Sequence, residues 1–260
     1  MLDMGFGLNV EKIANHPTMH PKGIRRVCTF SATFPDEVQA LAATYMEDYI
    51  FVTTGIVGGT NSDVEQLFFQ CPKRDKRAKL IEVLQDLGDA KTIFFVDSKK
   101  TADFVTALLC NNNLQPTSIH ADHLQSQREQ ALRDVKNGIR NIPVATNVAA
   151  RALDIAEVNY VLNYDLPTDI EEYVHRVGRT GRVGNVGKSI RFFDEERDGP
   201  NAGKFVSLLI KPNANAPLFM QAMVSGVTGM GYNFSAPSTQ GGFASRNIRR
   251  FETWICCLAH

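Results

Sequence analysis

The chain has 260 residues, of which 43% are hydrophobic and 22% charged, a composition typical of a folded globular protein with one large domain or one and a half. Its 28 lysines and arginines balance 28 aspartates and glutamates, so a basic field over the whole chain is excluded and any nucleic-acid contact must come from locally placed charges. The five cysteines are odd in number and form no CxxC pair, which favours reduced thiols over a disulfide framework.

Strand-like and helix-like patterns alternate along the chain. The strand-like runs are short, β-branched or aromatic and mostly unbroken, as expected for strands that are buried on both faces. This alternation predicts an α/β fold in which helices flank a parallel sheet. The expected strands are 25–30, 49–54, 65–71, 92–96, 116–120, 142–146, 159–164 and 188–193, and the expected helices are 36–47, 76–88, 101–112, 125–138 and 169–177.

Composition marks two boundaries. The segment GIVGGTNSD (55–63) carries glycine and polar residues between strand-like runs, which is typical of a linker. After residue 211 the periodicity fades into a Gly-, Ser-, Asn- and Pro-rich tail (212–260), which we expect to have little order. Residues 1–54 contain only two or three elements, so we expect them to be the end of a domain, whereas residues 64–211 form a domain of their own.

The stretch Gly187-Lys188-Ser189 resembles the end of a phosphate-binding P-loop. A P-loop has the form GxxxxGK[ST], follows a buried strand and opens a helix whose N-terminal amides meet the phosphates. The required first glycine falls on Arg182, and the residues after Ser189 have a strand pattern. We therefore interpret this stretch as a glycine-rich turn that enters a strand.

Three arginines precede this turn at intervals of three residues: Arg176, Arg179 and Arg182. Thr168 or Asp169 is a suitable N-cap for a helix here, and if that helix continues, the three side chains share one face. Guanidinium groups bind phosphate oxygens through two donors, so such a face can stabilise charge on a transferring phosphoryl group. A solvated basic helix face is the alternative, and the spacing alone does not decide between them.

The segment HRVGRTGR (175–182), which contains these arginines, resembles motif VI of the DEAD-box ATP-dependent RNA helicases, nearest to the Vasa-like germline members. Other motifs of that family follow in its order over about residues 1–211. They are MLDMGF (1–6), which resembles the residues after the DEAD box, Ser31-Ala32-Thr33 (the SAT motif), TIFFVDSKKTAD (92–103, motif IV), SIHADHLQSQREQAL (118–132, the HGD…QxxRE segment) and VATNVAARALDI (144–155, motif V).

The resemblance implies a RecA-like fold, with residues 64–211 as the second, C-terminal helicase lobe and residues 1–54 as a remnant of the first lobe. In this family the two lobes clamp ATP and single-stranded RNA, and the first lobe holds most of the ATP and Mg²⁺. Carried over residue by residue, Arg179 and Arg182 would be catalytic arginine fingers, Asp154 would bind the nucleotide, Ser98, Arg128 and Thr146 would contact RNA, and Ser31, Thr33, His175 and Arg176 would couple the lobes.

The roles in RNA binding agree with the chemistry of the residues. Ser98, His120 and Thr146 fall at or just after the ends of expected strands, where ligands gather in a parallel sheet, and small hydroxyls suit contacts with a nucleic-acid backbone. Each residue has a structural alternative, such as an N-cap for Ser98 or a surface charge for Arg128. No zinc site is expected at His120 or His175, because we find no Cys or second His at ligand spacing.

The arginine-finger hypothesis carries a structural condition. Arg179 and Arg182 must project into a gap where a neighbouring lobe presents its triphosphate. The assignment fails if the two side chains turn away from the ligand-bearing edge of the sheet, or if internal carboxylates hold them.

Three positions depart from the family pattern. Ala121 and Ala152 stand where the family commonly has glycine, and His123 replaces a common arginine. A methyl group at a glycine position costs on the order of 1 kcal/mol where the backbone φ is positive, so the RNA contacts are in question at these places.

The sequence also contains neither GxxxxGK[ST] nor DEAD. We therefore expect a fragment, truncated product or incomplete gene model of a larger helicase that hydrolyses little ATP alone. Its partners would be single-stranded RNA, the missing first lobe and helicase cofactor proteins, in the cytoplasm, with granules and the nucleus left open. The alternative is a non-catalytic module that binds RNA or partner proteins. No membrane span or signal peptide is expected, because no long uncharged apolar window occurs.

Overall fold

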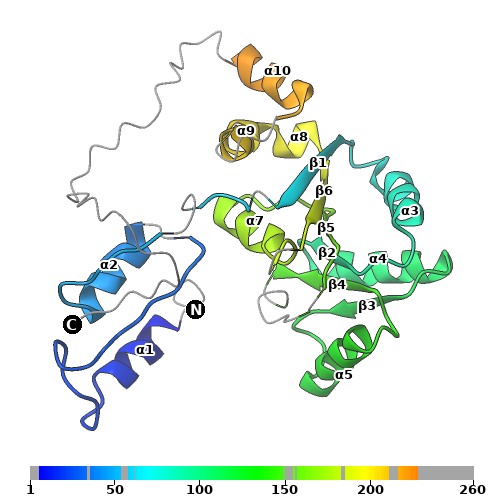
Figure 1. Ribbon diagram of the computed structural model, residues 1–260. Helices are drawn as coiled ribbons and strands as arrows, with labels where there is room; N and C mark the ends of the chain where they lie inside the picture. Colours follow the sequence, from blue (N-terminus) through cyan, green and yellow to red (C-terminus); the bar gives the residue numbers. More distant parts are fainter. Residues whose placement is uncertain are drawn as a thin grey trace. The chain divides into compact units, whose positions relative to one another are not determined.

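The computed structural model describes residues 6–33, 36–53, 58–61, 63–147, 149, 155, 157–182, 185–210 and 216–227. The described residues up to Gly58 belong to one compact unit and those from Gly59 onward to another, so the division falls inside the segment 55–63 (Figure 1). Within the described residues, no helix combines the length and the apolar character that crossing a bilayer requires.

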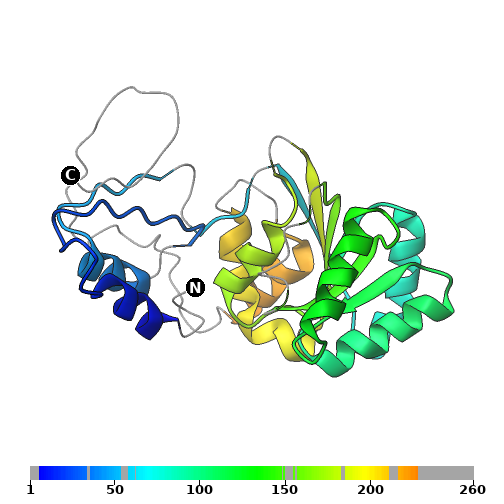
Figure 2. The same ribbon diagram turned by 90° about the horizontal axis from the view of Figure 1, so that it is seen from below.

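In its described residues the first unit has two helices, α1 (Gly7–Ala14) and α2 (Asp36–Tyr45), and the described chain between them consists of turns and irregular segments (Figure 2). The strands expected at 25–30 and 49–54 are wrong, since the described residues of both runs have no regular secondary structure. A strand exists only where a neighbouring segment accepts and donates its backbone hydrogen bonds, and the described part of this unit provides no such partner.

The second unit is built around a six-stranded parallel sheet with the order β1-β6-β5-β2-β4-β3 (Figure 1). This arrangement confirms the predicted α/β class, and all six strands expected between residues 64 and 193 are present. The strands are β1 (Val64–Gln70), β2 (Thr92–Val96), β3 (Pro116–Ile119), β4 (Ile142–Thr146), β5 (Tyr160–Asn163) and β6 (Gly187–Phe193).

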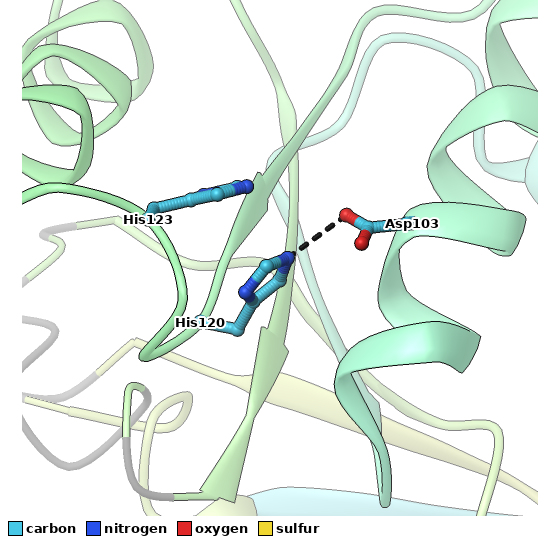
Figure 3. Close-up of side chains that lie close together, drawn as sticks. All are labelled: Asp103, His120 and His123. Carbon is cyan, nitrogen blue, oxygen red and sulfur yellow. Dashed lines mark hydrogen bonds and ion pairs between the residues drawn. The ribbon is translucent and has the colours of Figure 1, made fainter.

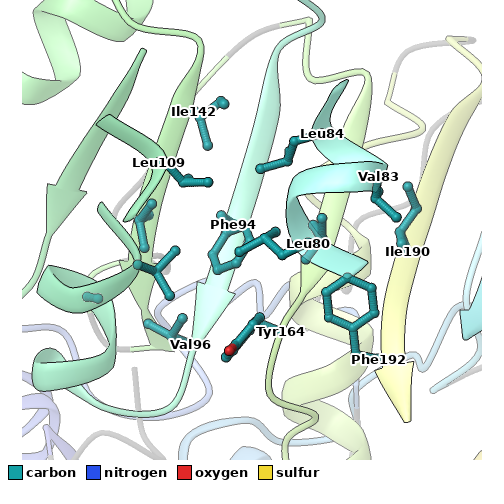
Figure 4. Packing of buried hydrophobic residues seen from close by; sticks show 14 of the residues in the cluster. Leu80, Val83, Leu84, Phe94, Val96, Leu109, Ile142, Tyr164, Ile190 and Phe192 are labelled. Atoms are coloured by element: carbon teal, nitrogen blue, oxygen red, sulfur yellow. The ribbon is translucent and has the colours of Figure 1, made fainter. Parts of the chain in front are cut away.

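Helices cover both faces of this sheet. Because successive residues of a strand point to opposite faces, Phe94 and Val96 of β2 pack under one set of helices, and Ile93 and Phe95 pack under another. The first set is α3 (Lys76–Leu87) and α4 (Lys99–Asn111), whose core is seen in Figure 4. On the opposite face, α5 (Gln125–Lys136) covers β2, β3, β4 and β5 through Ala131 and Val135.

A third cluster covers β1 and β6 on the opposite face. It consists of side chains from α7 (Ile170–Val177), α9 (Ala202–Ile210) and α10 (Leu218–Val227), which follow the short α8 (Glu195–Asp198) and η2 (Gly199–Asn201). The lobe therefore includes α10, which lies beyond residue 211, within the segment for which the sequence predicts little order. Met220 is fully buried, and the ring of Phe219 lies 5.6 Å from that of Phe193, so apolar burial orders a helix that glycine- and asparagine-rich flanks obscure in the sequence.

Candidate functional site

Polar side chains gather at the carboxyl edge of three neighbouring strands. Ser98 lies two residues after β2, His120 directly follows β3, and Thr146 is the last residue of β4. Because β2, β4 and β3 are adjacent and parallel, these strand ends lie along the same edge of the sheet. The expected strand-end positions of the three residues are thereby confirmed.

Ser98 performs a structural task at this edge. It is the N-cap of α4, where its Oγ accepts a hydrogen bond from the backbone N–H of Thr101 at 3.0 Å and contacts the Thr101 hydroxyl at 2.8 Å. The side chain nevertheless remains exposed, so the N-cap interpretation holds without removing Ser98 from the surface of the edge. Thr146, by contrast, is only 9% exposed.

Arg128 lies in the first turn of α5, the helix that starts after the carboxyl end of β3. Its side chain is half-buried, and its Nε is buried with no hydrogen-bond partner among the described residues. An unpartnered buried donor is unfavourable, so this guanidinium has unused capacity to bind an acceptor.

Arg176 differs from the sequence interpretation. The helix α7 ends at Val177, so the continuous helical face that was to carry all three arginines does not form, and the side chain of Arg176 is 2% exposed. Its guanidinium instead joins the ends of β2, β4 and β5 to α7. Its bonds run from Nε to Asn147 Oδ1 (2.7 Å), from Nη1 to the Asp165 carbonyl (2.6 Å) and Asn163 Oδ1 (3.4 Å), and from Nη2 to Glu172 Oε1 (2.6 Å) and Asp97 Oδ1 (3.2 Å).

A second arginine extends this network. Arg197 of α8 pairs with Asp97 and, at 3.0 Å, with Asp165 Oδ1. Burial lowers the pKa of Arg197, but the two carboxylates outweigh burial and the pKa is raised. Lys76 of α3 adds a hydrogen bond of 2.9 Å to the Tyr164 carbonyl. Asp97, Arg197 and Lys76 are not predicted as site residues from the sequence. For Asp97 a signal was available, because it directly follows the buried strand β2 and so lies at the carboxyl edge of the sheet.

The sequence GRTGR (178–182) forms a tight turn at the opposite, amino edge of the sheet. The Thr180 hydroxyl donates to the Val158 carbonyl at 2.6 Å, just before β5 starts. Gly181 adopts a φ of +67°, and a Cβ there would lie 2.4 Å from Val64 Cγ2 at the start of β1. At the start of β6, a Cβ on Gly187 would meet Thr180 Oγ1 at 2.1 Å. A glycine is therefore required at position 187 for the 178–182 turn to pack against β6.

Gly187, Lys188 and Ser189 are the first three residues of β6, so the expected strand is confirmed, but the stretch itself is strand rather than a turn, and it is not a P-loop. Lys188 is used within the sheet, because its Nζ pairs with Glu65 Oε2 on β1 at 2.9 Å. The Glu65 hydrogen bond raises the pKa of this lysine. Ser189 continues directly into the rest of β6, so a strand stands where a P-loop has the helix N-terminus that binds phosphate.

Arg179 and Arg182 are carried by this amino-edge turn. Arg179 Nε donates to the His175 carbonyl at 3.2 Å, and Arg182 Nε donates to the Gly178 carbonyl at 2.7 Å, so the turn's own backbone orients both guanidinium groups. Arg182 is exposed, while Arg179 and His175 are half-buried. The turn that carries the two arginines therefore lies at a different edge of the sheet from Ser98 and the other expected RNA contacts, and their reach toward the triphosphate of a neighbouring lobe stays a prediction.

Five other positions singled out in the sequence have separate outcomes. Asp154, the expected nucleotide ligand, and Ala152 lie outside the described residues. Ala121 is described and is not among the residues with positive φ, so the backbone strain considered for it does not arise. In the first unit, Ser31 is exposed and its Oγ accepts from the backbone N–H of Thr33 at 3.4 Å, whereas Thr33 is buried.

The carboxyl edge also holds a group of potential metal ligands that sequence reasoning missed. Asp103, His120 and His123 each offer one ligand atom, and these atoms lie within 4.8 Å of one another. The expectation that no second His lies at ligand spacing from His120 is wrong, because His123 follows it by three residues. An HxxH spacing on a turn was the available signal.

Comparisons with known proteins connect this architecture to helicases. Residues 75–184 match the family described as helicase conserved C-terminal domain. The chain is 45% identical over 262 residues to the ATP-dependent RNA helicase vasa of Drosophila melanogaster, an alignment that covers 98% of the chain and 39% of that protein. It is 43% identical to the probable ATP-dependent RNA helicase DDX4 of Homo sapiens, covering 97% of the chain and 36% of the relative. The chain thus spans well under half of these relatives.

Solved structures also align with the parallel sheet and helices of this chain. Saccharomyces cerevisiae Dbp5 bound to RNA and ADP BeF3 aligns with a TM-score of 0.62 and 28% identity, covering 77% of this chain and 53% of that one. The C-terminal domain of the DEAD-box protein Dbp5 aligns with a TM-score of 0.53 and 28% identity, covering 65% of this chain and 98% of that one. The parallel sheet flanked by helices therefore matches the RecA-like C-terminal lobe of such proteins.

Proposed function

Because this chain belongs to the DEAD-box RNA helicase family and carries its helicase C-terminal domain, we propose that it acts as the C-terminal part of an ATP-dependent RNA helicase. In this role the carboxyl edge of its sheet binds the backbone of single-stranded RNA. The observation that carries the proposal is the gathering of Ser98, Thr146 and Arg128 at the ends of β2 and β4 and the start of α5. Hydroxyl and guanidinium donors bind phosphates without reading the base sequence.

Arg128 supports this proposal most directly. Its buried Nε lacks a partner among the described residues, and a phosphate oxygen would supply the missing acceptor. The chain has no net charge, so binding depends on a few placed cations rather than on a general field. We therefore expect weak, salt-dependent binding to which each contacting cation contributes a measurable share.

A matched pair of arginines in α5 tests the RNA surface. Arg128→Gln should weaken the binding of a fluorescent single-stranded RNA by about 10-fold, as a charged hydrogen bond of about 1.5 kcal/mol implies, and should reduce the salt slope by about one. Arg133 lies in the last turn of the same helix, bonded to Gln130, so Arg133→Gln serves as the control. Equal effects of the two substitutions in fluorescence anisotropy would contradict the proposed surface.

We further propose that Arg179 and Arg182 act on a triphosphate that another lobe holds. Among the described residues, Gly187-Lys188-Ser189 does not fit the phosphates of ATP, because Gly187 begins β6 and Lys188 pairs with Glu65. The support for the two arginines is their place on a rigid turn, with Arg182 exposed at the amino edge. If they serve as fingers, they do so from a face separate from the RNA edge.

A chimera tests this second role. This chain would replace the matching 39% of the Drosophila relative, and RNA-stimulated ATP hydrolysis would be compared between the chimera and its variants. Arg182→Gln should lower the rate by about 10³-fold with little change in RNA binding, the amount typical of an arginine finger. Arg133→Gln should leave the rate unchanged, and a rate in Arg182→Gln within about twofold of the parent chimera would exclude the role.

A further inference from the structure

The carboxyl end of β3 carries a compact group of one carboxylate and two imidazoles (Figure 3). Asp103 lies on α4, His120 directly follows β3, and His123 lies on the turn that leads to α5. His120 Nε2 is 2.8 Å from Asp103 Oδ1, and the two imidazole rings have centroids 3.8 Å apart at an angle of 38°. Among the described residues, this is the one place where three such ligands come together.

The two histidines are held differently. The side chain of His120 is 3% exposed, and its Nδ1 is buried without a hydrogen-bond partner in the described part of the chain. His123 is half-buried, and its backbone N–H donates to the His120 carbonyl at 3.2 Å, which folds the turn back over the first ring. In Figure 3 a ring nitrogen of His123 faces the same side of the cluster as the Asp103 carboxylate. Three donor atoms therefore converge on one small volume.

We propose that Asp103, His120 and His123 form a binding site for a divalent transition-metal ion of the zinc class, with the remaining coordination positions open to water. Two imidazoles and one carboxylate are ligands that suit Zn²⁺, Co²⁺ and Ni²⁺, whereas Mg²⁺ and Ca²⁺ prefer all-oxygen sites. A site with three protein ligands and an open fourth position is the arrangement of accessible rather than purely structural zinc sites.

The distances require only small adjustments. In a tetrahedral site with bonds of about 2.1 Å, the ligand atoms are separated by about 3.4 Å, which lies between the 2.8 Å contact and the 4.8 Å limit seen here. Asp103 is 60% exposed at its side chain and His123 lies on a turn, so both ligands have room to move toward the buried His120.

The surroundings favour a cation at this position. The Ser118 hydroxyl lies 3.4 Å from Asp103 Oδ1 and helps to orient the carboxylate. Lys99, the nearby positive charge on α4, is paired with Asp122. The lysine charge is thereby compensated, and the site keeps the single negative charge of Asp103.

Titration of the full chain with Co²⁺ and Zn²⁺ tests the proposal. Cobalt bound by nitrogen and oxygen gives weak visible bands, whereas cobalt bound by cysteine thiolates adds strong near-ultraviolet charge-transfer absorption, so the two kinds of site are separable in one spectrum. His123→Gln and Asp103→Asn each remove one ligand without changing the buried His120, and circular dichroism of the metal-free proteins checks that they fold. His16→Gln, which alters an exposed histidine of the first unit, is the matched control.

The expected result is one equivalent of nitrogen- and oxygen-bound cobalt, displaced by Zn²⁺, with affinity at least about 10-fold lower in His123→Gln and Asp103→Asn and unchanged in His16→Gln. Zinc should also raise the thermal midpoint of the wild-type chain more than that of either ligand variant. The proposal is overturned if only thiolate-type absorption develops, or if His123→Gln and Asp103→Asn bind the metal as the wild type does.

Discussion

The buried guanidinium of Arg176 gives the sharpest test of how this lobe is held together. Replacing it with methionine keeps much of the side-chain volume but removes five hydrogen bonds that join β2, β4 and β5 to α7. The substitution also leaves Asp97 and Glu172 without this partner at the carboxyl edge. We expect the lobe to lose a large share of its stability, because a typical domain has only about 5–15 kcal/mol in total.

The size of the loss follows from burial. Removing one partner of a fully buried ion pair costs about 3–5 kcal/mol, because the remaining charge is left desolvated. Here the side chains of Asp97 and Glu172 are 36% and 20% exposed, so water recovers part of that cost. We expect Arg176→Met to lower the free energy of unfolding by about 3 kcal/mol.

Urea unfolding followed by far-ultraviolet circular dichroism measures the loss, and peptide-level hydrogen exchange locates it. Exchange should increase in peptides that cover the ends of β2, β4 and β5, while β1 changes less. Arg182→Met is the control from the same motif, because its guanidinium is exposed, and it should change stability by less than about 0.5 kcal/mol. Equal losses in the two variants would refute the assignment of Arg176 as a structural residue.

A second buried arginine provides a contrast in the same assay. Arg191 is fully buried between the rings of Phe68 and Tyr173, but its Nε and Nη1 have no hydrogen-bond partner among the described residues, and burial lowers its pKa to about 10. A poorly satisfied buried charge contributes little net stability, so Arg191→Met should cost about 1 kcal/mol or less. A cost as large as that of Arg176→Met would contradict this reasoning about hydrogen-bond satisfaction.

Two further predictions follow from local geometry. Gly187→Ala should destabilise the lobe by about 3 kcal/mol or more, because the added Cβ would meet Thr180 Oγ1 at 2.1 Å. Gly203→Ala in α9 is the control: its Cβ would meet no atom within 4 Å, so it should be neutral or stabilise the lobe by about 0.5–1 kcal/mol. Thermal melts measure both changes. Cys71 is buried and its pKa is raised by that burial, so at pH 8 iodoacetamide should label it at least about 10-fold more slowly than the exposed Cys110. Mass spectrometry measures both rates, and equal labelling in the folded chain would contradict the buried position.

The sequence by itself determined the sheet of the second unit. Its six strands coincide with runs that the sequence marks as strand-like, among them the unbroken apolar TIFFV (92–96), because a strand buried on both faces favours an apolar segment. Ser98 and Thr146 could be placed at strand ends for the same local reason. The runs 25–30 and 49–54 have equal apolar character yet are not strands in their described residues, since pairing depends on a neighbour that local pattern cannot show.

Only the tertiary structure decided what the charged residues do. Arg176, Arg179 and Arg182 look equivalent in the sequence, but the end of α7 at Val177 sends the first into a buried network and the other two onto an amino-edge turn. The group of Asp103, His120 and His123 likewise combines α4, the end of β3 and a turn. Spacing along the chain reports neighbours within one element, whereas burial and ligand geometry arise from contacts between elements.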